Sequence, residues 1–180
     1  MGQAKQLVQV DGEQMVRRAV RVALASGAAR VVLVTGAYAG EVAAAVADFV
    51  RDAAGRLHLV HNPHWETGQA GSMQAGIGAL PATCEAVIFL PVDQPYVEPL
   101  LLDQLVAAWR QGAALAAPVV DGELRGAPAL FDRSLWLELN QVKGDVGGRM
   151  VLRAHAARVH QVAAPAAWLR DVDTPQDLLE

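Results

Sequence analysis

The sequence has a single cysteine, Cys84, so no disulfide can form within the chain, which suits a reducing cytoplasm. It has no Lys/Arg-rich block, and its formal net charge of -4 argues against nucleic-acid binding. No apolar run reaches the roughly 18 residues that a membrane span requires, and the stretch 1–5 does not resemble a signal peptide. These absences predict a cytoplasmic protein that binds neither nucleic acid nor a membrane.

Several common catalytic motifs are missing as well. The five histidines show no His-Glu-x-x-His spacing, and the chain has neither a Gly-x-Ser-x-Gly elbow nor a Gly-x4-Gly-Lys-Ser/Thr loop. Cys84 has no evident base partner, and we interpret it as a bystander. What is present is a chain of 180 residues, 53% of them hydrophobic, which is enough for one domain with a buried core.

The hydrophobic pattern alternates between strand and helix. Short β-branched runs predict buried parallel strands, and apolar residues at helical spacing predict helices between them. We expect strands at 31–35, 57–60 and 86–90, and helices at 14–26, 41–51, 72–80 and 99–109. This order predicts an α/β fold with a doubly wound, Rossmann-like, mostly parallel sheet, in which ligands bind beyond the carboxyl ends of the strands.

The C-terminal part has a different pattern. Two apolar runs, 114–120 and 127–131, flank Asp121-Gly122, which is a hairpin-type turn signal. Short helices are expected at 134–139 and 147–155, and brief strands at 159–162 and 169–172. Thr174-Pro175 reads as a helix start, with Thr174 as the N-cap. We therefore expect an antiparallel C-terminal portion of the sheet.

The strongest chemical signal is Leu90-Pro91-Val92-Asp93-Gln94-Pro95, where an apolar strand ends in a carboxylate flanked by two prolines. The prolines fix the backbone on both sides, so Asp93 should project from a stiff strand end. Magnesium that arrives with a nucleotide takes only one or two protein carboxylates. Asp93 is therefore a candidate magnesium ligand, although it would equally suit a cap before the helix at 99–109.

Weaker signals surround it in the sequence. Glycines before the helix at 72–80 would let backbone N–H groups approach an anion or a base edge, although Ser72 would also serve there as an ordinary N-cap. Lys5, near Gly2, offers a point charge for phosphate. Of the two carboxylates Asp171 and Asp173, we expect one to face the site and the other to be structural. Four further residues would form a polar rim for an acceptor or would simply mark loops: Gly126, Gly144, Asp145 and Arg149.

Taken in order, these segments resemble the MobA-like NTP transferases, and within them the molybdenum cofactor cytidylyltransferase branch. The matching segments are Met1-Gly2-Gln3-Ala4-Lys5, Asn62-Pro63-His64-Trp65 through Ser72, Leu90–Pro95, Gly126–Phe131, Gly144–Gly147 and Asp171–Leu178. The resemblance implies a fold like that of the nucleotide-diphospho-sugar transferases. It also implies transfer of CMP from CTP to the phosphate of molybdopterin, with Mg²⁺ as cofactor, pyrophosphate as product and a molybdenum hydroxylase as client.

The resemblance also implies roles for individual residues. Asp93 and either Asp173 or Asp171 would hold magnesium, and Asp93 and Lys5 would be catalytic. The implied nucleotide-binding residues are Gly2, Lys5, Gly71 and Ser72, and the implied acceptor-binding residues are Gly126, Gly144 and Asp145. Two alternatives stay open, namely another phosphorylated acceptor and a non-catalytic accessory protein that binds nucleotide or cofactor.

One departure concerns the start of the chain. The family signature opens with a strand, a glycine-rich loop and an arginine before the methionine, whereas this sequence begins at Met1. We expect residues 1–180 to form a single nucleotidyltransferase domain that lacks this first strand and loop, and we expect the native N-terminus to lie upstream.

Overall fold

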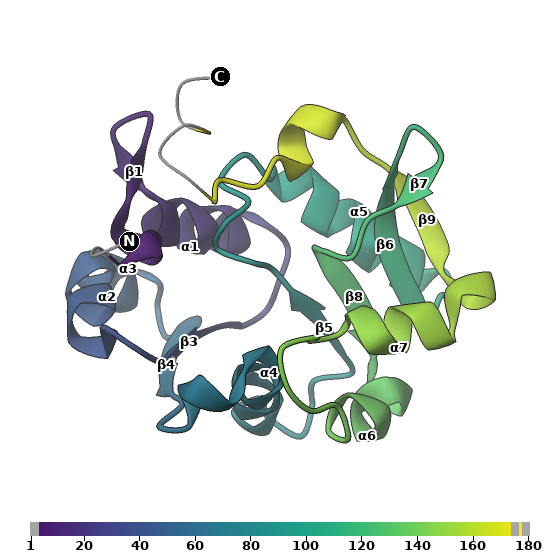
Figure 1. Cartoon of the computed structure of the whole chain (residues 1–180), viewed down its shortest axis with the longest axis horizontal. Coiled ribbons are helices and arrows are strands. Elements are labelled where there is room, and N and C mark those ends of the chain that lie inside the picture. Colours follow the sequence, from purple (N-terminus) through teal and green to yellow (C-terminus); the bar gives the residue numbers. More distant parts are fainter. Residues whose placement is uncertain (1–3, 174–176, 178–180) are drawn as a thin grey trace.

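The computed structural model describes residues 4–173 and 177 of the chain. The elements form an α/β fold in which helices cover strands of three separate sheets (Figure 1). Two of the sheets have two strands each, and the third has five. None of the described helices is both long enough and apolar enough to cross a membrane.

The N-terminal part begins with a short 3-10 helix, Lys5–Leu7, and a small hairpin of β1 (Gln9–Val10) and β2 (Glu13–Gln14). Asp11 and Gly12 turn the hairpin with positive φ angles of 50° and 79°. Helix α1 (Met15–Ala25) follows directly, and its apolar face is buried. The hairpin is absent from the sequence prediction, because strands of two residues carry no periodic signal.

A parallel pair of strands comes next. Strand β3 (Val31–Thr35) pairs with β4 (Leu57–His61) in the register Val31↔Leu57. The crossover between them contains α2 (Ala39–Ala45) and α3 (Ala47–Asp52) rather than the one helix predicted at 41–51. The break falls at Val46, whose φ of -116° and ψ of 13° lie outside the helical region, while its side chain is fully buried.

The five-stranded sheet has the order β5-β8-β6-β7, with β9 pairing with β6. The pairs are antiparallel except β6–β9, which is parallel. The strands are β5 (Ala86–Phe89), β6 (Leu115–Val120), β7 (Glu123–Leu124), β8 (Ala129–Asp132) and β9 (His160–Ala163). The helices of this half are α4 (Gln69–Gly78), α5 (Pro99–Arg110), α6 (Trp136–Leu139) and α7 (Arg149–Ala154).

Two apolar clusters cover the two faces of this sheet. Helix α4, α6 and α7 pack on one face around Phe131 and Leu139, which are about as buried as any residue in the chain. Helix α5 packs on the other face through Leu101 and Leu105. A third cluster joins α1 to α2, β3 and β4. The α/β class and the antiparallel C-terminal portion predicted from the sequence are confirmed.

Strands β3 and β5 each have an edge that pairs with no described strand. The N–H of Val31 donates to Arg56 O, and Thr35 O accepts from the N–H of Asn62. The backbone groups of the odd-numbered residues of β3 therefore face β4. Those of Val32 and Val34 face the opposite side. In the same way, the hydrogen bond from Arg133 N–H to Glu85 O shows that the odd-numbered residues of this segment face β8. The backbone groups of Ala86 and Ile88 therefore face away from β8 and pair with no described strand. In Figure 1 the β3–β4 pair lies to the left of β5, next to α4.

Several element boundaries differ from the prediction. The predicted strand at 169–172 is wrong, because Ala166–Leu169 is a 3-10 helix and an irregular segment follows it. Asp121 and Gly122 form the predicted turn with φ angles of 51° and 81°, but they join β6 to β7 before the chain reaches β8. The predicted helix start at Thr174 and Pro175 lies outside the described residues.

Candidate active site

Asp93 lies in the irregular segment that follows β5, as the flanking prolines predict. The backbone carbonyl of Asp93 accepts a hydrogen bond of 2.8 Å from the backbone N–H of Val172. Val172 is 2% exposed and packs with Val10 and Met15. This contact fixes the C-terminal segment beside the end of β5, and so brings together carboxylates that are some eighty positions apart in the sequence.

Lys5 joins the two carboxylates that the resemblance singled out. Its Nζ lies 3.3 Å from Oδ2 of Asp93 and 2.5 Å from Oδ1 of Asp173. The side chain of Asp93 is 38% exposed and that of Asp173 is 69% exposed, so both oxygens can be reached from solvent. Of the two candidates for the second carboxylate, Asp173 is the one that shares a cation with Asp93. Gly2 lies outside the described residues.

The pKa values reflect this arrangement of charges. Partial burial tends to lower the pKa of Lys5, but the hydrogen bond to Asp173 and the charge of Asp93 outweigh it, so the net pKa is raised. Burial raises the pKa of Asp171, and the negative charges of Asp93 and Asp173 raise it further against a hydrogen bond with Gln94 that lowers it. Lys5 therefore stays protonated.

The pair of Asp93 and Asp173 fits a magnesium ion that arrives with a nucleotide. Both side chains already converge on a single cation, the ammonium of Lys5. Such an ion takes one or two carboxylates from the protein, since phosphate oxygens and water complete its coordination. Among the described residues no group of three His, Cys, Asp or Glu side chains is arranged to hold a metal ion without such help.

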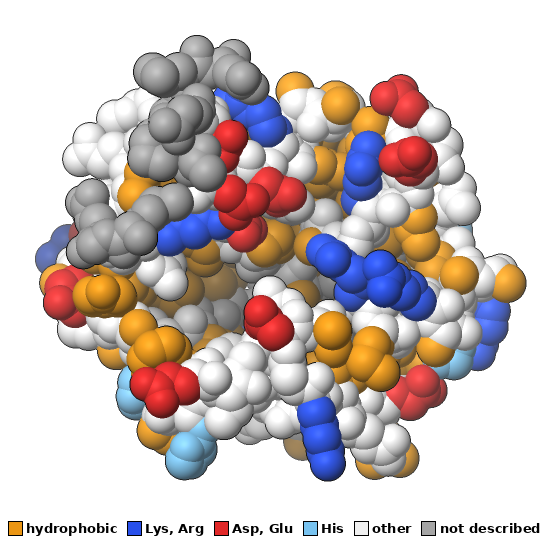
Figure 2. Space-filling view, viewed as in Figure 1, with side chains coloured by type: hydrophobic (Ala, Val, Ile, Leu, Met, Phe, Trp, Pro, Cys, Tyr) orange, Lys and Arg blue, Asp and Glu red, His pale blue; other side chains and the backbone are white. Residues whose placement is uncertain are grey.

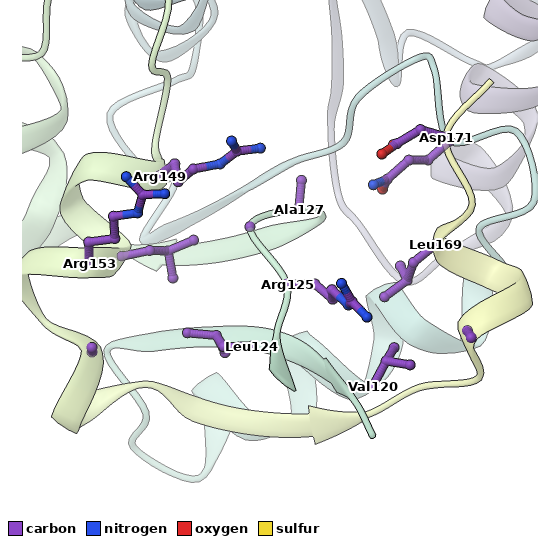
Figure 3. A pocket seen from close by; sticks show the side chains of 13 residues that line it. Val120, Leu124, Arg125, Ala127, Arg149, Arg153, Leu169 and Asp171 are labelled. Carbon is purple, nitrogen blue, oxygen red and sulfur yellow. The ribbon is translucent and has the colours of Figure 1, made fainter. Parts of the chain in front are cut away.

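A pocket of about 500 Å³ opens next to this cluster. Asp171 lines one side of it, and Arg149 and Arg153 of α7 line the other (Figure 3). Val120 and Leu124 form part of its apolar lining. Figure 2 shows the same arrangement on the surface, with basic and acidic side chains gathered on opposite sides of a hollow.

Gly126, one of the three candidate acceptor residues, lines this pocket. A Cβ added at Gly126 would approach Nε of Arg149 to 3.0 Å. Because Gly126 has no side chain, the side chain of Arg149 can pass close to the backbone at this position.

Gly144 and Asp145 have a different place. The carbonyl of Gly144 accepts a bond of 3.0 Å from Ala70 N–H, and Oδ1 of Asp145 accepts one of 3.1 Å from Gln69 N–H. Both thus cap the N-terminus of α4, and neither lines the described pocket. A Cβ on Gly68 would lie 2.6 Å from the backbone of Gly144, so this approach requires glycine.

Gly71 and Ser72 lie in the first turns of α4, which begins at Gln69, so Ser72 is not the N-cap. The hydroxyl of Ser72 accepts a bond of 3.1 Å from the side-chain amide of Asn62, which is 5% exposed. A Cβ on Gly71 would meet Thr67 Oγ1 at 3.2 Å. These two residues are therefore held tightly against the loop 62–68.

Sequence reasoning missed Arg125, Arg153 and Gln94 as lining residues of the pocket. Arg125 follows β7 and Arg153 lies in α7, so 28 positions of chain separate them without a common motif. Gln94 lies within the strongest motif, directly after Asp93. Its position next to Asp93 was the one signal in the sequence that could have identified it. Its Oε1 is buried and has no hydrogen-bond partner among the described residues.

Comparison with known proteins identifies the family of this fold. A model of the MobA-like NTP transferase domain matches residues 1–159. A search of curated proteins gave no match. Rv0371c of Mycobacterium tuberculosis is 21% identical with a TM-score of 0.77, over 98% of this chain and 88% of that one, and it has also been solved with manganese.

Two further solved structures show the same fold. A nucleotidyl transferase from Methanothermobacter is 21% identical with a TM-score of 0.79, over 97% of this chain and 82% of that one. The 4-diphosphocytidyl-2C-methyl-D-erythritol synthase of Anaerococcus prevotii is 15% identical with a TM-score of 0.75, over 95% and 85%.

Proposed function

Because this chain belongs to the MobA-like NTP transferase family, we propose that it transfers CMP from CTP to the phosphate of molybdopterin and releases pyrophosphate. The observation that carries the proposal is the convergence of Asp93 and Asp173 on Lys5 beside a pocket of about 500 Å³. A metal and nucleotide site next to a separate pocket is what a two-substrate transfer requires.

In the proposed reaction an oxygen of the acceptor phosphate forms a bond to the α-phosphorus of CTP. The bond between the α-phosphorus and the oxygen that bridges to the β-phosphorus breaks, and pyrophosphate leaves with that electron pair. Such chemistry depends on positioning and on neutralising charge more than on covalent steps. Bound at Asp93 and Asp173, magnesium would supply charge neutralisation at the phosphate oxygens.

The side chains of this protein contribute in three ways. Lys5 provides a positive charge, because its raised pKa keeps the side chain protonated. We assign this charge to binding of the triphosphate. Gly71 and Ser72 would contact the base or the ribose. The pocket beside Asp171 would hold the acceptor, with Gly126 in its wall. Gly144 and Asp145 would act on the acceptor side only indirectly, by fixing the start of α4.

The choice of CTP and of molybdopterin rests on the resemblance of Met1–Lys5 and the later motifs to the cytidylyltransferase branch. One solved relative of the same fold is a diphosphocytidyl synthase by name, which agrees with a cytidylyl nucleotide. A molybdenum hydroxylase would then receive the product. Another phosphorylated acceptor is the alternative, because acceptor pockets are formed by variable loops.

Mass spectrometry of the acceptor tests this proposal. The protein is incubated with CTP, magnesium and molybdopterin, and the acceptor should gain the mass of one cytidylyl group. Omission of either CTP or magnesium should abolish the gain. An unchanged acceptor in the complete mixture, with CTP still bound, would support the non-catalytic accessory role instead.

A further inference from the structure

Three arginines in the pocket have no firm partner on the protein. The side chains of Arg149 and Arg153 make no ion pair or hydrogen bond with any described residue, and Arg125 makes only a loose pair with Glu123 at 3.6 Å. Guanidinium groups bind carboxylates and phosphates through paired hydrogen bonds. Three of them line one pocket in which Asp171 is the single lining carboxylate, and this leaves a net positive charge that an anionic ligand would balance.

The backbone is shaped to admit one of these arginines. Gly126 has no side chain where Nε of Arg149 passes, and a Cβ there would come within 3.0 Å of that nitrogen. Figure 3 shows Arg149 and Arg153 on one side of the pocket and Asp171 on the other. An anionic group is therefore favoured on the arginine side and repelled by the carboxylate on the opposite side.

The other lining residues indicate which further chemical groups the ligand carries. Val120, Leu124 and Leu169 add apolar surface to the lining, with Leu169 on the side of Asp171 (Figure 3). Gln94 also lines the pocket, and its buried Oε1 lacks a hydrogen-bond donor among the described residues. A buried acceptor without a donor is destabilising, and a donor on the ligand would remove that penalty.

We propose that Arg125, Arg149 and Arg153 form an anion-binding site for the acceptor, distinct from the nucleotide site at Lys5 and Asp93. The inference rests on the proposed function and narrows the class of acceptor. The acceptor carries an anionic group for the arginines, an apolar or planar body, and an N–H or O–H donor for Gln94. A pocket of about 500 Å³ is within the range of sites for small organic ligands.

Binding is tested without turnover, with inorganic phosphate and phenyl phosphate as probes. Arginine Nε–H signals are followed by NMR as each probe is added to the whole chain. Phosphate should shift the signals of Arg149 and Arg153 in a saturable way, and phenyl phosphate should bind at least threefold more tightly because its ring covers apolar lining. The double variant R149Q/R153Q should weaken binding at least tenfold.

Arg110 provides the matched control. It lies exposed at the end of α5, away from the pocket, and no described residue pairs with its side chain. R110Q should leave phosphate affinity unchanged. Equal shifts at Arg110 and Arg149 would overturn the proposal, since they would show non-specific attraction of anions. Displacement of phosphate from Arg149 by magnesium and CTP would also overturn it, because the arginines would then belong to the nucleotide site.

A kinetic comparison separates this inference from the proposed function. In the transfer reaction R149Q/R153Q should raise the KM for molybdopterin at least tenfold and leave the KM for CTP unchanged. An increase in the KM for CTP alone would contradict the acceptor assignment. If the wild-type chain transfers nothing, the proposed function fails, whereas the phosphate titration still decides whether the arginines form an anion site.

Discussion

The backbone amide of Val172 donates a hydrogen bond of 2.8 Å to the carbonyl of Asp93. Because Val172 is buried, this bond holds the C-terminal segment beside the end of β5. The neighbouring Asp173 can then reach the same lysine as Asp93. The site therefore depends on a backbone contact between two distant segments, and its carboxylates can be changed without removing that contact.

Replacement of Asp93 tests its role as a metal ligand. D93A should retain the fold, because the side chain is 38% exposed and the backbone bond to Val172 remains. Nucleotidyl transfer should fall at least about a hundredfold, which corresponds to roughly 2.7 kcal/mol of barrier. D52A is the control, since Asp52 is an exposed carboxylate paired with Arg51. Turnover close to wild type in saturating magnesium would rule out the assignment.

Lys5 competes with a metal ion for both carboxylates when no nucleotide is bound. K5M should therefore bind Mn²⁺ more tightly than the wild type, by up to about fivefold if the exposed pairs are worth about 0.2–1 kcal/mol. The same variant should lose turnover, because the triphosphate loses its positive partner. Calorimetry of Mn²⁺ binding measures the first effect, and K143M, which alters the only other lysine, is the control. Weaker Mn²⁺ binding by K5M would contradict this account.

The nucleotide preference follows from the resemblance to the cytidylyltransferase branch. The kcat/KM for CTP should exceed that for GTP in the transfer assay. Parallel initial rates with the two nucleotides measure the ratio directly. A higher kcat/KM for GTP would assign the chain to the guanylyl branch.

The ion pair of Asp48 with Arg17 makes stability depend on pH. The guanidinium of Arg17 holds the pKa of Asp48 at about 2, below the ordinary value of 3.8, through two hydrogen bonds of 2.7 Å. A lowered carboxylate pKa stabilises the fold above the unfolded value, and this contribution is lost as the pH falls from about 4 toward 2. Thermal unfolding of D48N and the wild type should differ at pH 6 and converge near pH 2. A difference that persists at pH 2 would contradict the assignment.

The free edges of β3 and β5 predict a pattern of amide exchange. Amides that point away from the paired strand should exchange much faster than their neighbours that point toward β4 or β8, because only the latter are hydrogen-bonded. The fast set is Val32, Val34, Ala86 and Ile88. Hydrogen exchange followed by NMR checks this. Strong protection of the fast set would show that further backbone pairs with both edges.

The sequence was most informative where one short segment carries the signal. The apolar run before Asp93 and its flanking prolines sufficed to predict a strand end with a projecting carboxylate, and the structure has it there. Alternation of strand and helix likewise predicted the α/β class. These features are local, and local patterns can be read from spacing alone.

Features that depend on distant contacts were not predictable. The sequence led us to expect a strand in which one of Asp171 and Asp173 faces the site and the other is structural, but it did not say which one. The segment is irregular instead, and Asp173 reaches Lys5 while Asp171 lines the pocket. The arginines of the pocket come from two distant segments, the stretch after β7 and helix α7, which both line it.

Pyrophosphate release tests the central claim most directly. The chain is mixed with CTP, magnesium and molybdopterin, and pyrophosphate is measured against the amount of acceptor converted. The account predicts one pyrophosphate per acceptor, no release when the acceptor is omitted, and at least about a hundredfold slower release by D93A. Bound CTP without any release of pyrophosphate in the complete mixture would contradict it.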